Sequence, residues 1–105
     1  MTIKYIIADG LDLNFYSERE AAEAYIEAID ARAHVYRGYD ESGRCLKISP
    51  KGESAQITLA EQHPNHADEL RDLLVRYLTA IGKPPQTNDL RSLLEICERL
   101  GRKNP

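Results

Sequence analysis

The chain begins with apolar and polar side chains in alternation, the two-residue period typical of a β-strand. The alternation covers residues 2–8 and returns over residues 11–16. Between the two stretches, Asp9-Gly10 is typical of a two-residue hairpin turn, because both central positions of such a turn need positive φ. We therefore expect two paired strands at the N-terminus.

The period becomes helical after Ser17. Ser17 and Glu20 have the spacing of a capping box, in which two backbone N–H groups at a helix start are satisfied reciprocally. An apolar stripe follows with helical spacing: Ala22, Tyr25, Ile26 and Ile29. An acidic stripe lies roughly a third of a turn away from it: Glu20, Glu23, Glu27 and Asp30. We expect a helix here, with the acidic stripe off its buried face.

Residues 34–49 have the pattern of a β-hairpin around the turn Asp40–Gly43. An Asp that opens a turn and a Gly that closes it suit a type I turn with the Gly at positive φ. Two registers fit the sequence, because a four-residue loop pairs Val35 with Ile48 and a bulged three-residue loop pairs Tyr36 with Ile48. A slip of one residue exchanges the two faces of a strand. The sequence therefore leaves open which of the two side chains points outward.

The rest of the chain predicts one short strand and two helices. We expect Pro50-Lys51-Gly52 to end the hairpin and residues 56–59 to form a further strand. An amphipathic helix is expected to start at His63-Pro64-Asn65, with a second one capped by Thr87 or Asn88. Apolar residues recur with helical spacing in both: Leu70, Leu73, Leu74, Tyr77, Leu78 and Ile81, then Leu90, Leu93, Leu94, Cys97 and Leu100.

Length and composition agree with one globular domain over residues 1–105. A chain of 105 residues is close to the common domain size, and 42% hydrophobic with 30% charged residues is ordinary for a folded protein. We predict an α+β fold with a small antiparallel sheet, built from an N-terminal strand or hairpin, the central hairpin and the short further strand. One helix follows the first strands, and two amphipathic helices end the chain.

The charge of the chain limits its partners. The formal net charge is −3, and residues 1–49 hold nine acids against six Lys or Arg. This balance disfavours nucleic acid, which needs a basic footprint, and favours a basic protein partner. No apolar stretch has the length of a membrane span, and the start of the chain lacks the pattern of a signal peptide. Cys45 and Cys97 lie far apart in apolar patterns, which predicts two buried, reduced thiols in a cytoplasmic protein.

Candidate catalytic or metal-binding residues are few. His63 and His66 have the spacing of metal ligands, but no Cys or further His lies nearby to complete a site. Cys45 and Cys97 fall inside a strand and a helix, away from a helix terminus that would lower a thiol pKa. We therefore predict no catalytic residue, no metal and no cofactor. A small metal- or thiol-dependent enzyme is the least favoured alternative.

Three runs of residues between positions 12 and 48 carry a likeness to a known group: Asp12-Leu13-x-Phe15-x-Ser17, Ala22-Glu23-x-Tyr25-Ile26-Glu27-x-Ile29-Asp30 and Tyr39-Asp40-x-x-Gly43-Arg44-x-Leu46. They resemble small bacterial immunity proteins of polymorphic toxin and contact-dependent growth inhibition systems. One departure is Ala28-Ile29-Asp30-Ala31, where a Pro-Asp-Val-like helix exit is expected. The resemblance implies a non-catalytic, cytoplasmic protein that binds and neutralises a cognate toxin.

The resemblance brings no binding residues with it, because each such immunity protein recognises its own toxin through its own surface. Our hypothesis joins the acidic stripe to hairpin residues of types that are favoured in protein interfaces. The residues are Glu20, Glu23, Glu27, Asp30, Tyr36, Arg37 and Tyr39. They would meet a basic cleft, such as a nuclease toxin needs for holding phosphates. The alternative is a generic interaction or regulatory module without a toxin partner, and the oligomeric state is left open.

Overall fold

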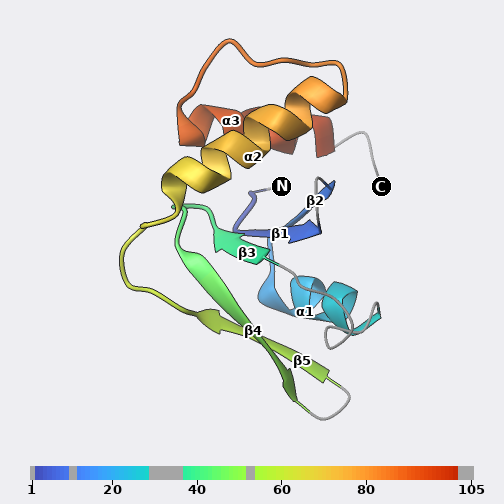
Figure 1. The fold of residues 1–105 in the computed structure, drawn as a ribbon. Helices are drawn as coiled ribbons and strands as arrows, with labels where there is room; N and C mark the ends of the chain where they lie inside the picture. Colours follow the sequence, from blue (N-terminus) through green and yellow to red (C-terminus); the bar gives the residue numbers. More distant parts are fainter. Residues whose placement is uncertain (1, 10–11, 29–36, 52–53, 102–105) are drawn as a thin grey trace.

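A five-stranded antiparallel sheet forms the middle layer of the protein in a computed structural model (Figure 1). The structure describes residues 2–9, 12–28, 37–51 and 54–101. The elements are β1 (Tyr5–Asp9), β2 (Asp12–Tyr16), α1 (Arg19–Ala28), β3 (Arg37–Asp40), β4 (Cys45–Lys51), β5 (Ser54–Leu59), α2 (Ala67–Ala80) and α3 (Leu90–Gly101). The strand order is β2-β1-β3-β4-β5. The predicted α+β fold is confirmed, with one helix after the first strands and two at the C-terminal end.

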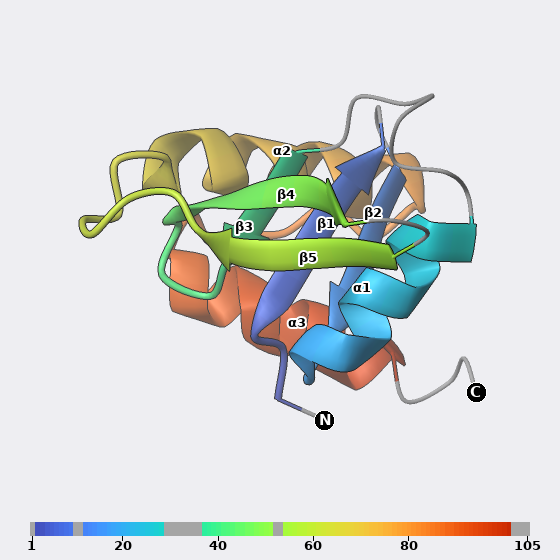
Figure 2. The same ribbon diagram turned by 90° about the horizontal axis from the view of Figure 1, so that it is seen from below.

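Helices cover both faces of the sheet, so the protein has two apolar cores (Figures 1 and 2). Ile6 and Ile7 are both fully buried although they are neighbours in β1, because successive side chains of a strand point to opposite faces. The core under α2 and α3 includes Ile6, Leu13, Tyr39, Leu70, Leu74, Leu78, Leu93 and Cys97. The core under α1 includes Ile7, Ala22, Ile26, Leu46 and Ile57. The two C-terminal helices thus cover the sheet and also pack on each other.

The β1–β2 hairpin confirms the predicted pairing but not the predicted turn. Asp9 pairs with Asp12, so residues 10–11, which lie outside the described residues, separate the strands. A turn centred on Asp9-Gly10 would instead have paired residues 8 and 11. The two registers differ by two residues, and such a shift leaves every side chain on its original face. The apolar pattern therefore could not distinguish them.

The β3–β4 turn has the bulged three-residue loop, one of the two registers that the sequence left open. Tyr39 pairs with Cys45. The Asp40 N–H donates to the Arg44 carbonyl at 3.0 Å, and the Gly43 N–H donates to the Asp40 carbonyl at 3.2 Å. Gly43 has φ +92°, as expected for the last residue of this turn. This register brings the Asp40 side chain within reach of the turn's own N–H groups.

Strand β4 continues through Pro50 to Lys51, so the expected end of the strand at Ser49 was wrong. The Ala60 N–H donates to the Cys45 carbonyl at 3.0 Å, which makes this pair a hydrogen-bonded one. Because hydrogen-bonded and non-bonded pairs alternate in an antiparallel ladder, Pro50 opposite Ala55 falls at a non-bonded position. Its missing N–H therefore costs the β4–β5 ladder no bond.

Helices α1 and α2 begin later than predicted. In α1 the first helical bond runs from the Ala22 N–H to the Glu18 carbonyl at 3.3 Å, which makes Glu18 the N-cap residue in place of Ser17. Helix α2 begins at Ala67 and not at His63. The His66 N–H before it donates to the Gly43 carbonyl at 3.1 Å, so the approach to α2 is fixed by a tertiary contact with the β3–β4 turn.

The N-cap of α3 is Asp89, not Thr87 or Asn88 as predicted. The Asp89 carboxylate accepts the Ser92 N–H at 3.0 Å and the Ser92 hydroxyl at 2.9 Å. The Asp89 carbonyl accepts the first helical bond from the Leu93 N–H at 2.9 Å. Thr87 helps to position the N-cap residue, because its hydroxyl accepts the Asp89 N–H at 3.1 Å.

Candidate functional site

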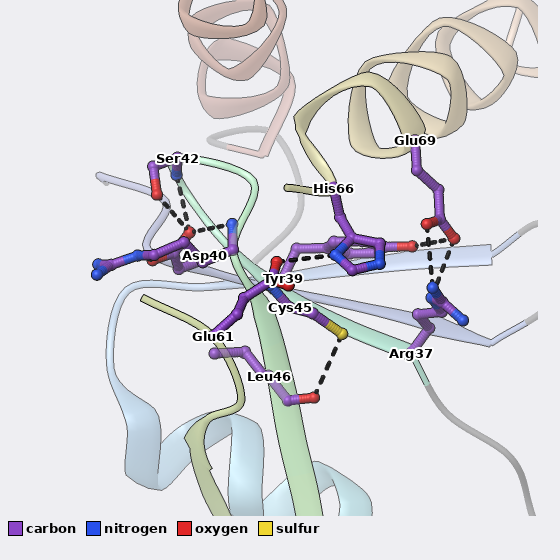
Figure 3. A network of polar contacts seen from close by, with 10 residues as sticks. Arg37, Tyr39, Asp40, Ser42, Cys45, Leu46, Glu61, His66 and Glu69 are labelled. Atoms are coloured by element: carbon purple, nitrogen blue, oxygen red, sulfur yellow. Dashed lines mark hydrogen bonds and ion pairs between the residues drawn. The ribbon is translucent and has the colours of Figure 1, made fainter. Parts of the chain in front are cut away.

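Of the residues that the sequence suggested as one binding surface, the four whose side chains the structure describes fall on opposite faces of the sheet. Glu20 and Glu23 lie on α1. Arg37 and Tyr39 point to the other face, where both contact Glu69 of α2 (Figure 3). Among the described residues, the structure therefore does not bring the acids of α1 together with the hairpin residues Arg37 and Tyr39.

The described part of the acidic stripe is not a free acidic surface. The Glu23 carboxylate is 17% exposed and accepts the Ile57 N–H at 2.8 Å, so it connects α1 to β5. The Arg19 guanidinium lies between the acids, 3.8 Å from Glu20 and 3.9 Å from Glu23. Glu20, at 74% exposed, is the acid of this pair that a partner could reach.

Three of the seven predicted residues lie wholly or partly outside the described residues. Glu27 belongs to α1, but its side chain is outside the described part. Asp30 and Tyr36 are outside it altogether. The question of whether Val35 or Tyr36 points outward therefore also lies outside the described residues.

Arg37 and Tyr39 form a polar link between β3 and α2 (Figure 3). The Tyr39 hydroxyl donates to a Glu69 oxygen at 2.7 Å, and an Arg37 Nη donates to the other oxygen at 3.1 Å. Tyr39 is fully buried. Burial, together with its bond to the Glu69 carboxylate, raises the pKa of this phenol above its usual range. Tyr39 therefore has no surface to offer a partner, whereas the half-exposed Arg37 side chain does.

A second polar link joins β4 to the segment before α2. A Glu61 oxygen accepts the Cys45 N–H at 2.6 Å and lies 2.8 Å from His66 Nδ1 (Figure 3). The bond with His66, and then that with Cys45, lowers the pKa of the Glu61 carboxyl. Burial raises the pKa of the Cys45 thiol, which donates to the Leu46 carbonyl at 3.7 Å. A thiol in this state is a poor nucleophile at neutral pH.

The most buried charged group of the described residues is the Asp40 carboxylate, 4% exposed in the β3–β4 turn. One of its oxygens accepts the Ser42 N–H at 3.0 Å, the Ser42 hydroxyl at 2.8 Å and the Arg44 N–H at 2.8 Å. The other lies 2.6 Å from Arg44 Nε. Burial by itself would raise the pKa of Asp40, but the hydrogen bonds outweigh it and hold the pKa below its ordinary value. This group fixes the turn.

The two predicted thiols differ in their surroundings. Cys97 is 3% exposed in the core under α2 and α3, as predicted. Cys45 is partly exposed, so the expectation that both thiols are buried was wrong for this one. Both are free thiols. Within the described ranges, no group of three or more His, Cys, Asp or Glu side chains is arranged to hold a metal ion.

Glu61 and Glu69, which hold these polar links together, were not among the residues that the sequence pattern pointed to. Glu61 lies between β5 and α2, and Glu69 lies in the first turn of α2. Glu61 binds Cys45, 16 residues away, and Glu69 binds Arg37, 32 residues away. Such long-range polar contacts leave no local pattern. They follow from the packing of α2 on the sheet.

A groove of about 430 Å³ opens on the α1 side of the sheet. It lies where α1 begins, near the ends of β1, β4 and β5 and the β3–β4 turn. Its lining includes Lys4, Tyr5, Arg19, Asp40, Glu41, Arg44, Leu46, Ile57, Thr58 and Leu59. This groove has room for a side chain from another molecule.

Comparison with protein-family models, curated proteins and solved structures finds no match for this chain. In the part of the chain that the structure describes, no helix is both long enough and apolar enough to cross a bilayer. The assignment of a function therefore rests on the residues themselves.

Proposed function

We propose that this protein is an immunity-type inhibitor, which binds a cognate bacterial toxin domain in the cytoplasm and neutralises it by protein–protein contact. The observation that carries the proposal is the resemblance of residues 12–48 to small immunity proteins. This segment supplies β2, α1, β3 and most of β4. Its likeness therefore concerns the central part of the fold.

The state of the reactive side chains supports binding over catalysis. The carboxylates of Glu61 and Glu69 each hold two donors in place. Burial raises the pKa of the Cys45 thiol, which opposes formation of a thiolate. General acid–base and nucleophilic chemistry both need a group that is accessible and has a suitable pKa. In these two polar links the groups instead connect the sheet to α2.

The structure leaves two of the predicted binding residues with little or no exposed surface for a toxin. Glu23 is bound to β5, and Tyr39 is buried. The described part of the acidic stripe thus gives little support to contact with a basic cleft. Among the predicted binding residues whose side chains are described, the exposed ones are Glu20 on one face of the sheet and Arg37 on the other.

Co-expression with the toxin domain encoded next to this gene tests the proposal. We expect growth to be rescued and the two proteins to purify as a complex. A toxin that still kills and does not co-purify would overturn the proposal. If the neighbouring gene does not encode a large secreted protein with a variable C-terminal domain, a generic interaction module becomes the better explanation.

A further inference from the structure

The groove beside α1 has an apolar floor and a partly exposed leucine at its rim. Leu46 and Ile57, which line it, are 6% and 2% exposed. Leu59, also in the lining, is 51% exposed. Among the described residues, Leu59 and Ile81 are the two exposed large hydrophobic side chains. Leu59 is thus an exposed apolar side chain that lines this groove.

The backbone at Leu59 lies on a free edge of the sheet. Strand β5 is last in the strand order, and Figure 2 shows α1 next to it. Because Ala60 bonds to Cys45 of β4, the alternation of the ladder turns the N–H groups of Ile57 and Leu59 away from β4. Glu23 satisfies the N–H of Ile57. The Leu59 N–H has no hydrogen bond to any other described residue and faces the side from which another strand would approach.

The charges that line the groove favour an acidic occupant. Three cations, Lys4, Arg19 and Arg44, stand against Asp40 and Glu41. Arg44 is already paired with Asp40, with 2.6 Å between Arg44 Nε and Asp40 Oδ2. Lys4 has no ion pair with another described residue, and Arg19 lies 3.8 Å or more from its nearest acids. An incoming carboxylate could therefore pair with Lys4 or Arg19 without breaking a tight contact.

We propose that the groove binds an extended, acidic segment of the partner protein. A large apolar side chain of the segment covers Leu59, and a backbone carbonyl accepts the Leu59 N–H, as in the addition of a strand to a sheet edge. A carboxylate of the segment pairs with Arg19. Identifying the partner as the toxin domain rests on the proposed function, but the chemistry of the groove does not.

A synthetic peptide tests the chemistry with the full-length protein. The probe is acetyl-Thr-Val-Leu-Val-Asp-Asp-amide, titrated into ¹⁵N-labelled protein. We expect amide shifts to concentrate at Tyr5, Arg19, Leu46 and Leu59. A matched peptide with Lys in place of both Asp residues should bind at least fivefold more weakly. Equal binding of the two peptides, or no shifts at the groove at millimolar peptide, would overturn the proposal.

Matched variants separate the groove from the rest of the surface. Leu59→Ser and Arg19→Glu should each weaken peptide binding about fivefold, since each loses one partly exposed contact. Ile81→Ser and Arg76→Glu change an exposed isoleucine and an exposed arginine elsewhere, on or beside α2, and should leave binding unchanged. Equal losses in both sets would contradict a groove-specific site.

The same variants distinguish failure of this inference from failure of the proposed function. If the wild-type protein protects against the toxin and Leu59→Ser with Arg19→Glu protects equally well, the groove is not the docking surface although the function stands. If the wild-type protein gives no protection while the peptide still binds at the groove, the proposed function fails and the acidic-segment site stands.

Discussion

Gly43 lies where the β3–β4 turn meets the first residue of α2. Its φ of +92° belongs to the left-handed region, where residues with a Cβ are strained. A Cβ at this position would also lie 2.8 Å from the Cβ of Ala67. Its carbonyl accepts the His66 N–H. One residue without a side chain thus allows the turn and the helix to pack together.

Replacing Gly43 should destabilise the protein more than replacing a glycine that has positive φ but no close neighbour. We expect Gly43→Ala to lower the free energy of unfolding by about 3 kcal/mol, because strain and overpacking add. Gly82, with φ +81° and no atom within 4 Å of the place that a Cβ would take, is the control. Gly82→Ala should cost about 1 kcal/mol. Equal losses in urea unfolding would show that the contact with Ala67 does not matter.

Asp40 makes stability depend on pH in the acid range. Its pKa is lower in the folded protein than in the unfolded chain, where an Asp titrates at about 3.9. Its contribution is therefore complete above that value and is lost as the pH falls through the folded pKa. We expect Asp40→Asn to lose about 1–3 kcal/mol at pH 7, because the bond with Arg44 loses its charge.

Urea unfolding between pH 7 and pH 2 measures this effect. The difference between the wild-type protein and Asp40→Asn should shrink as the pH falls below about 4. Asp72→Asn, which changes a carboxylate that is 57% exposed, is the control and should shift stability little at any pH. A difference that stays constant down to pH 2 would mean that Asp40 acts through its shape and not through its charge.

At the scale of elements, α1 protects part of the edge of β5. An edge strand presents unpaired N–H groups that can recruit other chains. Glu23 reaches from α1 to the N–H of Ile57 and takes the place of a neighbouring strand at this point. A side chain that the sequence assigned to an exposed stripe is thus part of the architecture.

Removing this carboxylate should loosen the edge locally. We expect Glu23→Ala to lower the free energy of unfolding by about 1–3 kcal/mol, because the Ile57 N–H loses its hydrogen-bond partner. Amide hydrogen exchange at Ile57 should accelerate more than exchange in α3. Glu20→Ala is the control, on the same helix but 74% exposed. It should change the free energy of unfolding by no more than about 0.5 kcal/mol and should leave exchange at Ile57 unchanged. Unchanged exchange at Ile57 would indicate that α1 packing alone protects this amide.

The elements were predictable from the sequence where burial determines the pattern, and their boundaries were not. The apolar residues Ala22 and Ile26 are fully buried, as their spacing indicated. The start of α2 was missed, because a contact between distant segments, from His66 to Gly43, fixes the chain just before the helix. The candidate site was less predictable still: nothing in the local pattern around Glu23 pointed to Ile57.

At the scale of the whole molecule, two cores share a single sheet. The core under α2 and α3 contains Cys97, whose pKa is raised to about 12 by burial and then by the nearby Glu98. The other core lies under α1. Because β1 contributes to both through Ile6 and Ile7, loss of one core should destabilise the other.

Cys97 can report on this coupling. In the variant Cys45→Ser, a thiol reagent such as DTNB at pH 8 should label Cys97 only when the protein opens. We expect its labelling to be at least tenfold slower than that of Cys45 in Cys97→Ser. Adding Ile26→Ala, which creates a cavity under α1 and costs about 2–5 kcal/mol, should speed the labelling of Cys97 on the opposite face. An unchanged rate would mean that the cores open independently.

The adjacent burial of Ile6 and Ile7 has a consequence for folding fidelity. If β1 slipped by one residue, each isoleucine would enter the opposite core and would still be buried. Burial of apolar side chains alone therefore does little to select the correct register of this strand. The Ile3 N–H, two residues before β1, donates to the Glu98 carboxylate of α3 at 2.8 Å, and this directional contact favours one alignment of the strand. Glu98→Ala should therefore populate misaligned compact states, and not simply a larger fraction of unfolded chains.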